Sequence, residues 1–267
     1  MEYIRLNNGM EMPQLGIGGF SQSEDAIETA LSLGYRLIDT AAQYENEEQV
    51  GAAIRNSSVG RDEIFLTTKL WTEDIRQNRT REAFFESLQR LKTDYVDLYL
   101  IHWPAEGFER AWLEMEKLQK EGYIRAIGVS NFHPKHFAKL EETASVSPVV
   151  NQVESHPRFN NRNLIIFCEK KDIRTEAWCP FGGTGARMLQ NTTLLELAEK
   201  YRRTSAQIIL RWDIQRGVIV IPRSAHRERM QENMQIFDFT LSEEDMEKID
   251  GLDAGRRLGA DPEDFLF

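Results

Sequence analysis

The stretch "SEDAIETALSLGYRLID", residues 23–39, predicts one helix followed by one strand. Apolar residues recur at helical spacing in its first part, where Ser23 can cap the start of the helix and Gly34 its end. The two apolar residues before Asp39 are typical of a buried strand. The strand ends on Asp39, so a carboxylate directly follows apolar core residues and needs a chemical explanation.

The same alternation of helix and strand continues outward from this unit toward both ends of the chain. A second helix is predicted for "TREAFFESLQRL", with Thr80 as its cap and Glu82 in its first turn, and a third ends at Gly122. Eight runs have the composition of strands: "LGIG" from Leu15, "YRLID" from Tyr35, "EIFLTTKL" from Glu63, "YVDLYLIHW" from Tyr95, "IRAIGVSN" from Ile124, "VVNQVE" from Val149, "IRTEAW" from Ile173 and "VIVIP" from Val218.

Eight strands that alternate with helices, without a Pro/Gly/Ser-rich linker, favour a single α/β domain over residues 1–267. We predict a (β/α)8 TIM barrel, preceded by a β-hairpin in "YIRLNNGMEMP" from Tyr3. The alternative is an open, doubly wound sheet. A dinucleotide-binding fold of that kind carries G-x-G-x-x-G after its first strand, and "GIGGFS" from Gly16 has Ser21 where the third glycine belongs.

The composition argues against several classes of protein. The 43 acidic and 33 basic residues give a net charge of -10, which disfavours a surface for nucleic acids or anionic membranes. The first residues lack the pattern of a signal peptide, and no run approaches the roughly 18 apolar residues of a membrane span. We therefore expect a cytoplasmic protein with Cys168 and Cys179 reduced.

His133 and His136 have a metal-like spacing but no third ligand nearby, so we predict no metal.

Polar residues end most of the predicted strands. Because the carboxyl ends of barrel strands open onto one face, these residues meet in space although they lie far apart in the sequence. Each residue alone can be explained as a turn cap or a side chain that extends into water, but together they indicate an acid-base site. In chain order they are Asp39, Lys69, His102, Ser130, Asn131, Gln152, Glu154, Arg223 and Ser224.

Tyr44, on the loop after Asp39, completes a set of residues suited to proton delivery. A phenol has a pKa near about 10, and an ammonium within about 4 to 6 Å favours its ionised form. Lys69 can supply that ammonium, and Asp39 can hold Lys69 in place. We therefore expect Lys69 to lower the pKa of Tyr44, and His102 to donate a hydrogen bond to the same substrate oxygen.

Six motifs in order along the chain resemble those of the aldo-keto reductase family. The resemblance covers nearly the whole chain and is strongest to short bacterial and protozoan members, including diketogluconate reductases. It implies a barrel without a Rossmann domain, a C-terminal loop over the active-site face, and NADPH-dependent reduction of ketoaldehydes, aromatic aldehydes or keto-sugars to alcohols. The motifs are "DTAAQYENE" from Asp39, "TTKLW" from Thr67, "LIHWP" from Leu100, "GVSNF" from Gly128, "NQVE" from Asn151, and "IPRS" from Ile221 with the later "EN".

The resemblance also implies roles for individual residues. Arg223, Ser224 and Arg229 would hold the 2′-phosphate of the cofactor. NADPH (NADP+ when oxidised) carries this phosphate and NADH does not, so two guanidinium groups there favour NADPH. The resemblance also implies a monomer. The implied catalytic residues are Asp39, Tyr44, Lys69 and His102, with Tyr44 as proton donor. The implied contacts of the nicotinamide are Ser130, Asn131, Gln152 and Trp178, and those of the adenosine end are Arg223, Ser224, Arg229, Glu232 and Asn233.

The substrate site is the part of the sequence that departs most from the family pattern. Gly19 and Phe20 stand where Thr-Trp is usual, so one cofactor contact and part of an aromatic wall are expected to differ. Cys179 replaces a common serine, whereas Arg223 replaces a common lysine and keeps the charge. The residues expected to line the substrate site are Phe20, Trp71, His102 and Trp103.

Two other functions fit parts of the sequence. A barrel with a reactive lysine can be a Schiff-base lyase, but that lysine must be neutral part of the time, and Asp39 would keep Lys69 charged. Related folds also serve as NADPH-binding sensing or regulatory subunits with little turnover, and an intact set of catalytic residues is compatible with that role. Carbonyl reduction is therefore the main prediction, and the regulatory subunit is its alternative.

Overall fold

In the computed structural model, which describes residues 1–183 and 187–264, eight parallel strands form one sheet. Each strand pairs with the next one along the chain, so the strand order in the sheet follows the sequence. All eight coincide with runs predicted from the sequence. The strands are β3 (Gly16–Gly18), β4 (Leu37–Asp39), β5 (Phe65–Leu70), β6 (Val96–Ile101), β7 (Ile124–Ser130), β8 (Val150–Glu154), β9 (Arg174–Trp178) and β10 (Ile219–Val220).

Hydrogen bonds between the first and last of these strands close the sheet into a barrel. The amide of Val220 donates to the carbonyl oxygen of Gln14 over 2.9 Å, and the amide of Gly18 donates to that of Pro222 over 3.2 Å. The strands approach so closely here that a Cβ on Gly18 would lie 2.8 Å from the carbonyl oxygen of Ile221. Glycine at position 18 therefore permits closure, and the open-sheet alternative is wrong.

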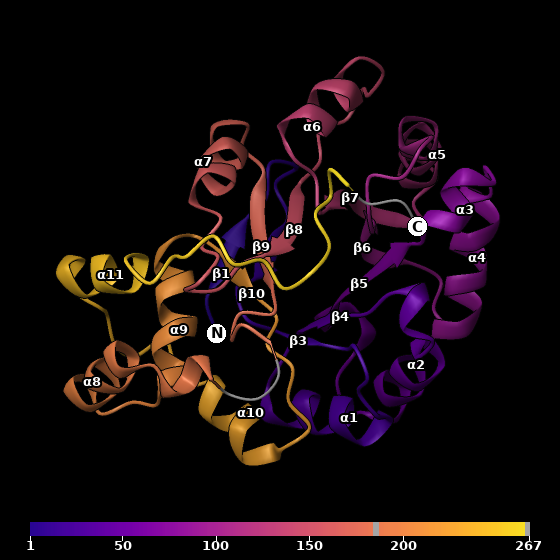
Figure 1. Ribbon diagram of the computed structural model, residues 1–267. Helices are drawn as coiled ribbons and strands as arrows, with labels where there is room; N and C mark the ends of the chain where they lie inside the picture. The colour runs from indigo at the N-terminus through magenta and orange to yellow at the C-terminus, as the bar shows by residue number, and fades with distance from the viewer. Residues whose placement is uncertain (184–186, 265–267) are drawn as a thin grey trace.

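Helices surround the barrel and cover the outer face of its strands (Figure 1). Within the described residues, no helix has the length and apolar character needed to cross a membrane.

The predicted antiparallel hairpin, β1 (Tyr3–Arg5) with β2 (Glu11–Pro13), precedes the barrel. The helices are α1 (Glu24–Leu33), α2 (Glu47–Asn56), α3 (Thr72–Arg76), α4 (Thr80–Leu91), α5 (Phe108–Lys120), α6 (Pro134–Glu141), α7 (Arg162–Lys170), α8 (Thr192–Tyr201), α9 (Ser205–Gln215), α10 (Arg227–Asn233) and α11 (Glu243–Asp250), with 3-10 turns η1 (Ala42–Tyr44), η2 (Arg61–Glu63) and η3 (Met188–Gln190).

The helix caps agree with the sequence in one case and differ in another. At α1, Ser23 Oγ accepts the amide of the third helical residue over 3.3 Å, and Gly34 ends the helix with a left-handed φ of 104°. The prediction that Thr80 caps α4 is wrong. The helix begins at Thr80 itself, because Arg79 takes the cap position and its carbonyl oxygen accepts the first helical hydrogen bond.

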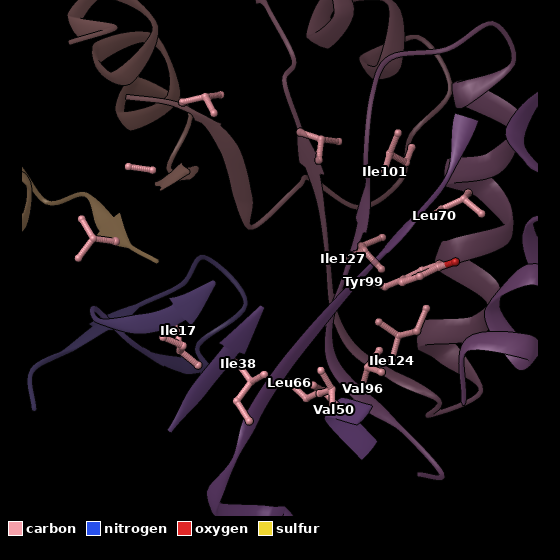
Figure 2. Close-up of a cluster of buried hydrophobic side chains, with 14 of the residues drawn as sticks. Ile17, Ile38, Val50, Leu66, Leu70, Val96, Tyr99, Ile101, Ile124 and Ile127 are labelled. Carbon is pink, nitrogen blue, oxygen red and sulfur yellow. The ribbon is translucent and has the colours of Figure 1, made fainter. Parts of the chain in front are cut away.

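The two faces of the barrel strands belong to two separate apolar clusters. Outward side chains such as Ile38 and Leu66 pack against the helices (Figure 2). Inward side chains include Leu37 and Ile219, the first residues of their strands, and Met12 of the hairpin packs in the same cluster. Apolar residues therefore fill the N-terminal end of the barrel interior, and polar residues can gather at the C-terminal end.

Candidate active site

A cavity of about 480 Å³ opens at the C-terminal end of the barrel strands. Its walls come from strand ends and from the loops that follow them, so residues far apart in the sequence meet here. This is the face on which the sequence predicted an acid-base site. The lining residues are Gly18, Phe20, Asp39, Tyr44, His102, Trp103, Ser130, Asn131, Gln152, Trp178, Cys179, Pro180, Phe181, Gly183, Ile221 and Arg223.

Asp39, Lys69 and Tyr44 form a continuous hydrogen-bonded chain at this cavity. Lys69 Nζ donates to Asp39 Oδ1 over 2.6 Å, to the Thr40 carbonyl oxygen over 2.9 Å and to the Tyr44 hydroxyl oxygen over 3.3 Å. The side chains of Lys69 and Asp39 are almost completely buried, and their strands are adjacent in the barrel. The three donors of the ammonium are thus used, and Tyr44 and Asp39, but not Lys69, are among the residues that line the cavity.

Lys69 is charged at neutral pH. Burial lowers the pKa of Lys69, but the charge of Asp39 and its hydrogen bond with Lys69 outweigh burial and raise the pKa above its ordinary value. A Schiff-base nucleophile must be neutral part of the time. The geometry therefore argues against the lyase alternative, as the sequence did.

The pKa of Tyr44 reflects burial as well as the charge of Lys69. Burial raises the pKa of Tyr44, whereas Lys69 lowers it and Asp39 partly offsets the effect of Lys69. Lys69 acts in the expected direction, but burial outweighs the ammonium, so the pKa of Tyr44 lies above its ordinary value. The Tyr44 hydroxyl consequently keeps its proton at neutral pH, which is the form that can donate it.

His102 packs against Tyr44 at the cavity, with the two ring centroids 5.6 Å apart and the rings nearly perpendicular at 77°. Burial and the nearby charge of Lys69 hold the pKa of His102 well below its ordinary value. The imidazole is therefore neutral at physiological pH. Its Nδ1 is buried and has no hydrogen-bond partner among the described residues. A neutral imidazole carries one N–H, which His102 can donate to an oxygen held beside Tyr44.

Four polar and aromatic side chains form another part of the cavity wall. Trp178 Nε1 donates to Asn131 Oδ1 over 3.0 Å, which fixes the indole ring. Asn131 Nδ2 donates to Ser130 Oγ over 3.1 Å, and Ser130 Oγ donates to the main-chain carbonyl oxygen of Gln152 over 2.8 Å. A fixed aromatic ring beside clustered amide and hydroxyl groups suits a flat ring that carries a carboxamide. This set of residues therefore fits a nicotinamide.

The structure adds Glu176, which the sequence reasoning treated only as part of a strand. Glu176 is completely buried in β9, and its Oε2 accepts a hydrogen bond from Gln152 Nε2 over 2.7 Å. The same Nε2 donates to Asp39 Oδ2 over 2.7 Å. A signal was present in the sequence, because Glu176 lies two residues before Trp178 and strand alternation places both on the inner face of the barrel.

The residues expected at the substrate site do not all reach the cavity. Phe20, His102 and Trp103 line it, whereas Trp71 is not among the lining residues and packs edge-on against His102, with the ring centroids 5.2 Å apart. Phe20 is 52% exposed, and its ring centroid lies 5.2 Å from that of Tyr44. Phe20 therefore stands at the open edge of the cavity, next to the candidate proton donor.

The residues expected at the adenosine end of the cofactor follow β10 and continue along α10. Arg223 lines the cavity and is exposed, and Arg229 is exposed on α10. Ser224 and Asn233 are buried, and the carboxylate of Glu232 accepts a hydrogen bond of 2.6 Å from the hydroxyl that caps α9. Of these five residues, Arg223 alone lies in the described wall of the cavity.

The histidine pair predicted not to bind a metal lies at the start of α6. His136 Nδ1 accepts the backbone amide of His133 over 3.0 Å, and His133 Nδ1 lies 3.0 Å from a Glu263 carboxylate oxygen. Across residues 1–183 and 187–264, no group of three or more His, Cys, Asp or Glu side chains is placed to hold a metal. Cys168 and Cys179 are free thiols.

The last described segment of the chain, residues 257–264, crosses the cavity end of β8 and β9 (Figure 1). The buried carboxylate of Glu154 accepts the backbone amides of Leu258 and Gly259 over 2.6 and 2.9 Å. The predicted C-terminal loop over the active-site face is confirmed for this segment. Residues 265–267, which were predicted to be part of the same loop, lie outside the described residues.

Glu154→Ala is expected to release this segment. The change removes the acceptor of two amides, and hydrogen bonds to a charged group are worth about 1.5 to 3 kcal/mol each. Trypsin should then cut after Arg257 at least about tenfold faster than in the wild type, as followed by mass spectrometry. Glu263→Gln serves as a control, because it weakens only the ion pairs of Glu263 with His133 and Lys135 at the surface. Equal acceleration by both changes would contradict the role of Glu154.

Comparison with known proteins assigns the chain to a family. The sequence pattern of the Aldo/keto reductase family matches residues 14–254. This chain belongs to the aldo/keto reductase family. It is therefore an oxidoreductase of the carbonyl-reducing class, in a family that generally uses NADP(H). The resemblance recognised in the sequence motifs is confirmed.

Individual relatives cover nearly all of this aldo/keto reductase. It is 47% identical over 270 residues to "Glyoxal reductase" of Bacillus subtilis (strain 168), covering 99% of this chain and 97% of the relative. It is 45% identical over 269 residues to "Methylglyoxal reductase DkgA" of Escherichia coli (strain K12), covering 98% and 97%. Among solved structures, MGS-M4, an aldo-keto reductase enzyme from a Medee basin deep-sea metagenome library, matches with a TM-score of 0.95 at 43% identity, covering 99% of this chain and 100% of that one.

Proposed function

We propose that this aldo/keto reductase uses NADPH to reduce small aldehydes and ketoaldehydes to alcohols, with Tyr44 as the proton donor. The observation that carries the proposal is the buried chain from Asp39 through Lys69 to Tyr44, which ends at the cavity against the neutral ring of His102. A protonated phenol held by an ammonium is suited to protonate a carbonyl oxygen, because the ammonium stabilises the phenolate that forms.

When bound, the reduced nicotinamide supplies a hydride to the carbonyl carbon. Tyr44 gives its proton to the carbonyl oxygen, so that an alcohol forms, and the remaining phenolate takes a proton from water. Lys69 stabilises the phenolate, and Asp39 keeps Lys69 in position. His102 donates its N–H to the same carbonyl oxygen and holds it near Tyr44.

The cavity wall supplies groups for the nicotinamide end of the cofactor, and Arg223 with the residues that follow it along α10 supplies groups for the adenosine end. Trp178 offers an aromatic face to the nicotinamide, and Ser130, Asn131 and Gln152 offer polar groups to its carboxamide. Gln152 would act through Oε1, because its Nε2 already donates to Asp39 and to Glu176. The residues proposed for the adenosine and its 2′-phosphate are Arg223, Ser224, Arg229, Glu232 and Asn233.

The proposed substrate class rests on the cavity and on the names of relatives. The cavity wall carries the apolar rings of Phe20 and Trp103, which suits small carbonyl compounds without a large charged group. The two relatives above are named for glyoxal and methylglyoxal, both small dicarbonyl compounds. Both are also named as reductases, which favours turnover over the regulatory alternative.

Oxidation of NADPH, and separately of NADH, tests this proposal when followed at the nicotinamide absorbance. The carbonyl panel is glyoxal, methylglyoxal, phenylglyoxal, nitrobenzaldehyde, xylose and keto-sugar acids. We expect turnover with NADPH and the ketoaldehydes. Tight binding of NADPH without turnover of any carbonyl would contradict reduction and favour the regulatory subunit, whereas no binding of NADPH would contradict the cofactor.

Replacing Arg223 and Arg229 by alanine is expected to raise the Kd for NADPH by about tenfold to 100-fold and to leave the Kd for NADH within about twofold. The reason is that NADPH alone carries the 2′-phosphate, to which a guanidinium can donate two hydrogen bonds. Fluorescence titration of the protein measures both constants. Arg227→Ala, an exposed change on the helix that carries Arg229, removes one positive charge from the same region and is the control. Equal weakening of both cofactors would show that neither arginine distinguishes them.

A further inference from the structure

Glu176 is a carboxyl group inside the barrel that the proposed mechanism does not use. It is completely buried in β9, where its register neighbours are Gln152 on β8 and Ile219 on β10. Glu176 Oε2 accepts a hydrogen bond from Gln152, and Oε1 has no partner among the described residues. A buried carboxyl oxygen without a partner is costly, so this position calls for a role beyond packing.

Gln152 links Glu176 to the residues proposed to deliver the proton. Its amide nitrogen has two hydrogens, and it donates one to Asp39 Oδ2 and one to Glu176 Oε2, each over 2.7 Å. The other oxygen of Asp39 accepts from Lys69, which in turn donates to Tyr44. The five side chains therefore form one hydrogen-bonded path across the barrel, with Glu176 at the buried end and Tyr44 at the cavity.

The charges along this path do not balance if every acid is ionised. The titratable groups that face Glu176 are Asp39 from β4, Lys69 from β5 and Tyr44 from η1, while its register neighbours cannot titrate. Two carboxylates would then share a single ammonium in a buried space. Burial and the charge of Asp39 raise the pKa of Glu176 to about 8, so Glu176 carries a proton at neutral pH.

We propose that Glu176 is a positioning residue for carbonyl reduction, which supports Asp39 through Gln152 while protonated and weakens proton donation by Tyr44 when it ionises. This inference rests on the proposed role of Tyr44. A second negative charge beside Asp39 raises the pKa of Tyr44 and makes the hydroxyl a poorer acid. Reduction therefore declines when the medium becomes alkaline enough to remove the proton from Glu176.

The pH profile of reduction tests the ionisation of Glu176. About one pH unit above the pKa only about a tenth of a group is protonated, so wild-type kcat/KM should fall about tenfold between about pH 7 and pH 9. Glu176→Gln keeps a hydrogen-bond acceptor for Gln152 but cannot ionise. Its kcat/KM should stay within about twofold over the same range. A decline in the variant that matches the wild type would overturn the proposal.

The positioning role is tested by a variant without an acceptor. Glu176→Met has a similar length but cannot accept from Gln152, so kcat should fall about tenfold at neutral pH while KM changes little. Glu176→Gln should restore kcat to within about twofold of the wild type. A purely structural role predicts instead that kcat per folded molecule is the same in both variants, and that result would overturn the proposal.

Thermal unfolding of the protein without cofactor gives a readout that does not depend on activity. Glu176 has an ordinary pKa of 4.5 and a folded pKa of about 8. The stability that protonated Glu176 contributes is therefore complete below about pH 4.5 and is lost as the pH rises to about 8. The wild type should lose about 8 °C more than Glu176→Gln in its unfolding midpoint across this window.

Asp213→Asn is the matched control for both measurements. Asp213 is a second fully buried carboxyl, lies on α9 outside the cavity wall, and has a pKa that burial raises to about 7. The control should alter the pH dependence of unfolding but leave the pH profile of reduction like that of the wild type. If Glu176→Gln unfolds with the pH dependence of the wild type, the proposal is overturned. Absence of reduction in the wild type would instead refute the proposed function, while the unfolding result would still stand.

Discussion

Tyr44→Phe lowers kcat for carbonyl reduction by at least about 100-fold and leaves the Kd for NADPH within about twofold, if Tyr44 donates the proton. The phenylalanine keeps the ring that packs against Phe20 and His102, so the cavity wall is preserved. The change removes only the hydroxyl that Lys69 holds. Initial rates at saturating NADPH and methylglyoxal, together with fluorescence titration of NADPH, measure the two effects separately.

Tyr99→Phe is the matched control for this experiment. Tyr99 is a fully buried tyrosine on β6, packed among the outward-facing core residues, and its hydroxyl has no hydrogen-bond partner among the described residues (Figure 2). Removal of that hydroxyl should leave kcat unchanged, because it lies outside the cavity wall. A Tyr44→Phe protein that retains more than about a tenth of the wild-type kcat would contradict the proton-donor role.

The barrel and the convergence of its polar strand ends could be predicted because both depend on periodic patterns. Apolar runs at strand spacing located all eight strands, and the rule that parallel strands end on one face was enough to bring Asp39, His102 and Gln152 together. The sequence left the open sheet as an alternative, because closure depends on how near Gly18 can approach Ile221, which follows β10. The monomeric state and the cytoplasmic location stay predictions.

The properties that the sequence did not reveal depend on distance and burial. The pKa of Tyr44 is set by a balance between desolvation and the charge of Lys69, and the residue types alone indicated the effect of Lys69 but not the larger effect of burial. Trp71 follows Lys69 closely in the sequence, yet it packs beside His102 instead of entering the cavity wall. Glu176 was hidden in an ordinary strand pattern, although alternation alone places it inside the barrel.

Lys69→Met is expected to lower both kcat and stability. The ammonium is the group that stabilises the Tyr44 phenolate, so kcat should fall by at least about 100-fold. The change also leaves Asp39 buried without its cation, and removal of one partner of a buried ion pair costs about 3 to 5 kcal/mol. Chemical denaturation measures the second effect, and NADPH oxidation with methylglyoxal, corrected for the folded fraction, measures the first.

The double change Asp39→Asn with Lys69→Met separates the two effects. Asparagine cannot ionise, so the double variant no longer buries an unpaired carboxylate and should recover at least about 2 kcal/mol of the lost stability. It still lacks the ammonium next to Tyr44, and its kcat should therefore remain at the level of Lys69→Met. If kcat recovers along with stability, Lys69 acts only by neutralising Asp39, and Tyr44 donates its proton without electrostatic help.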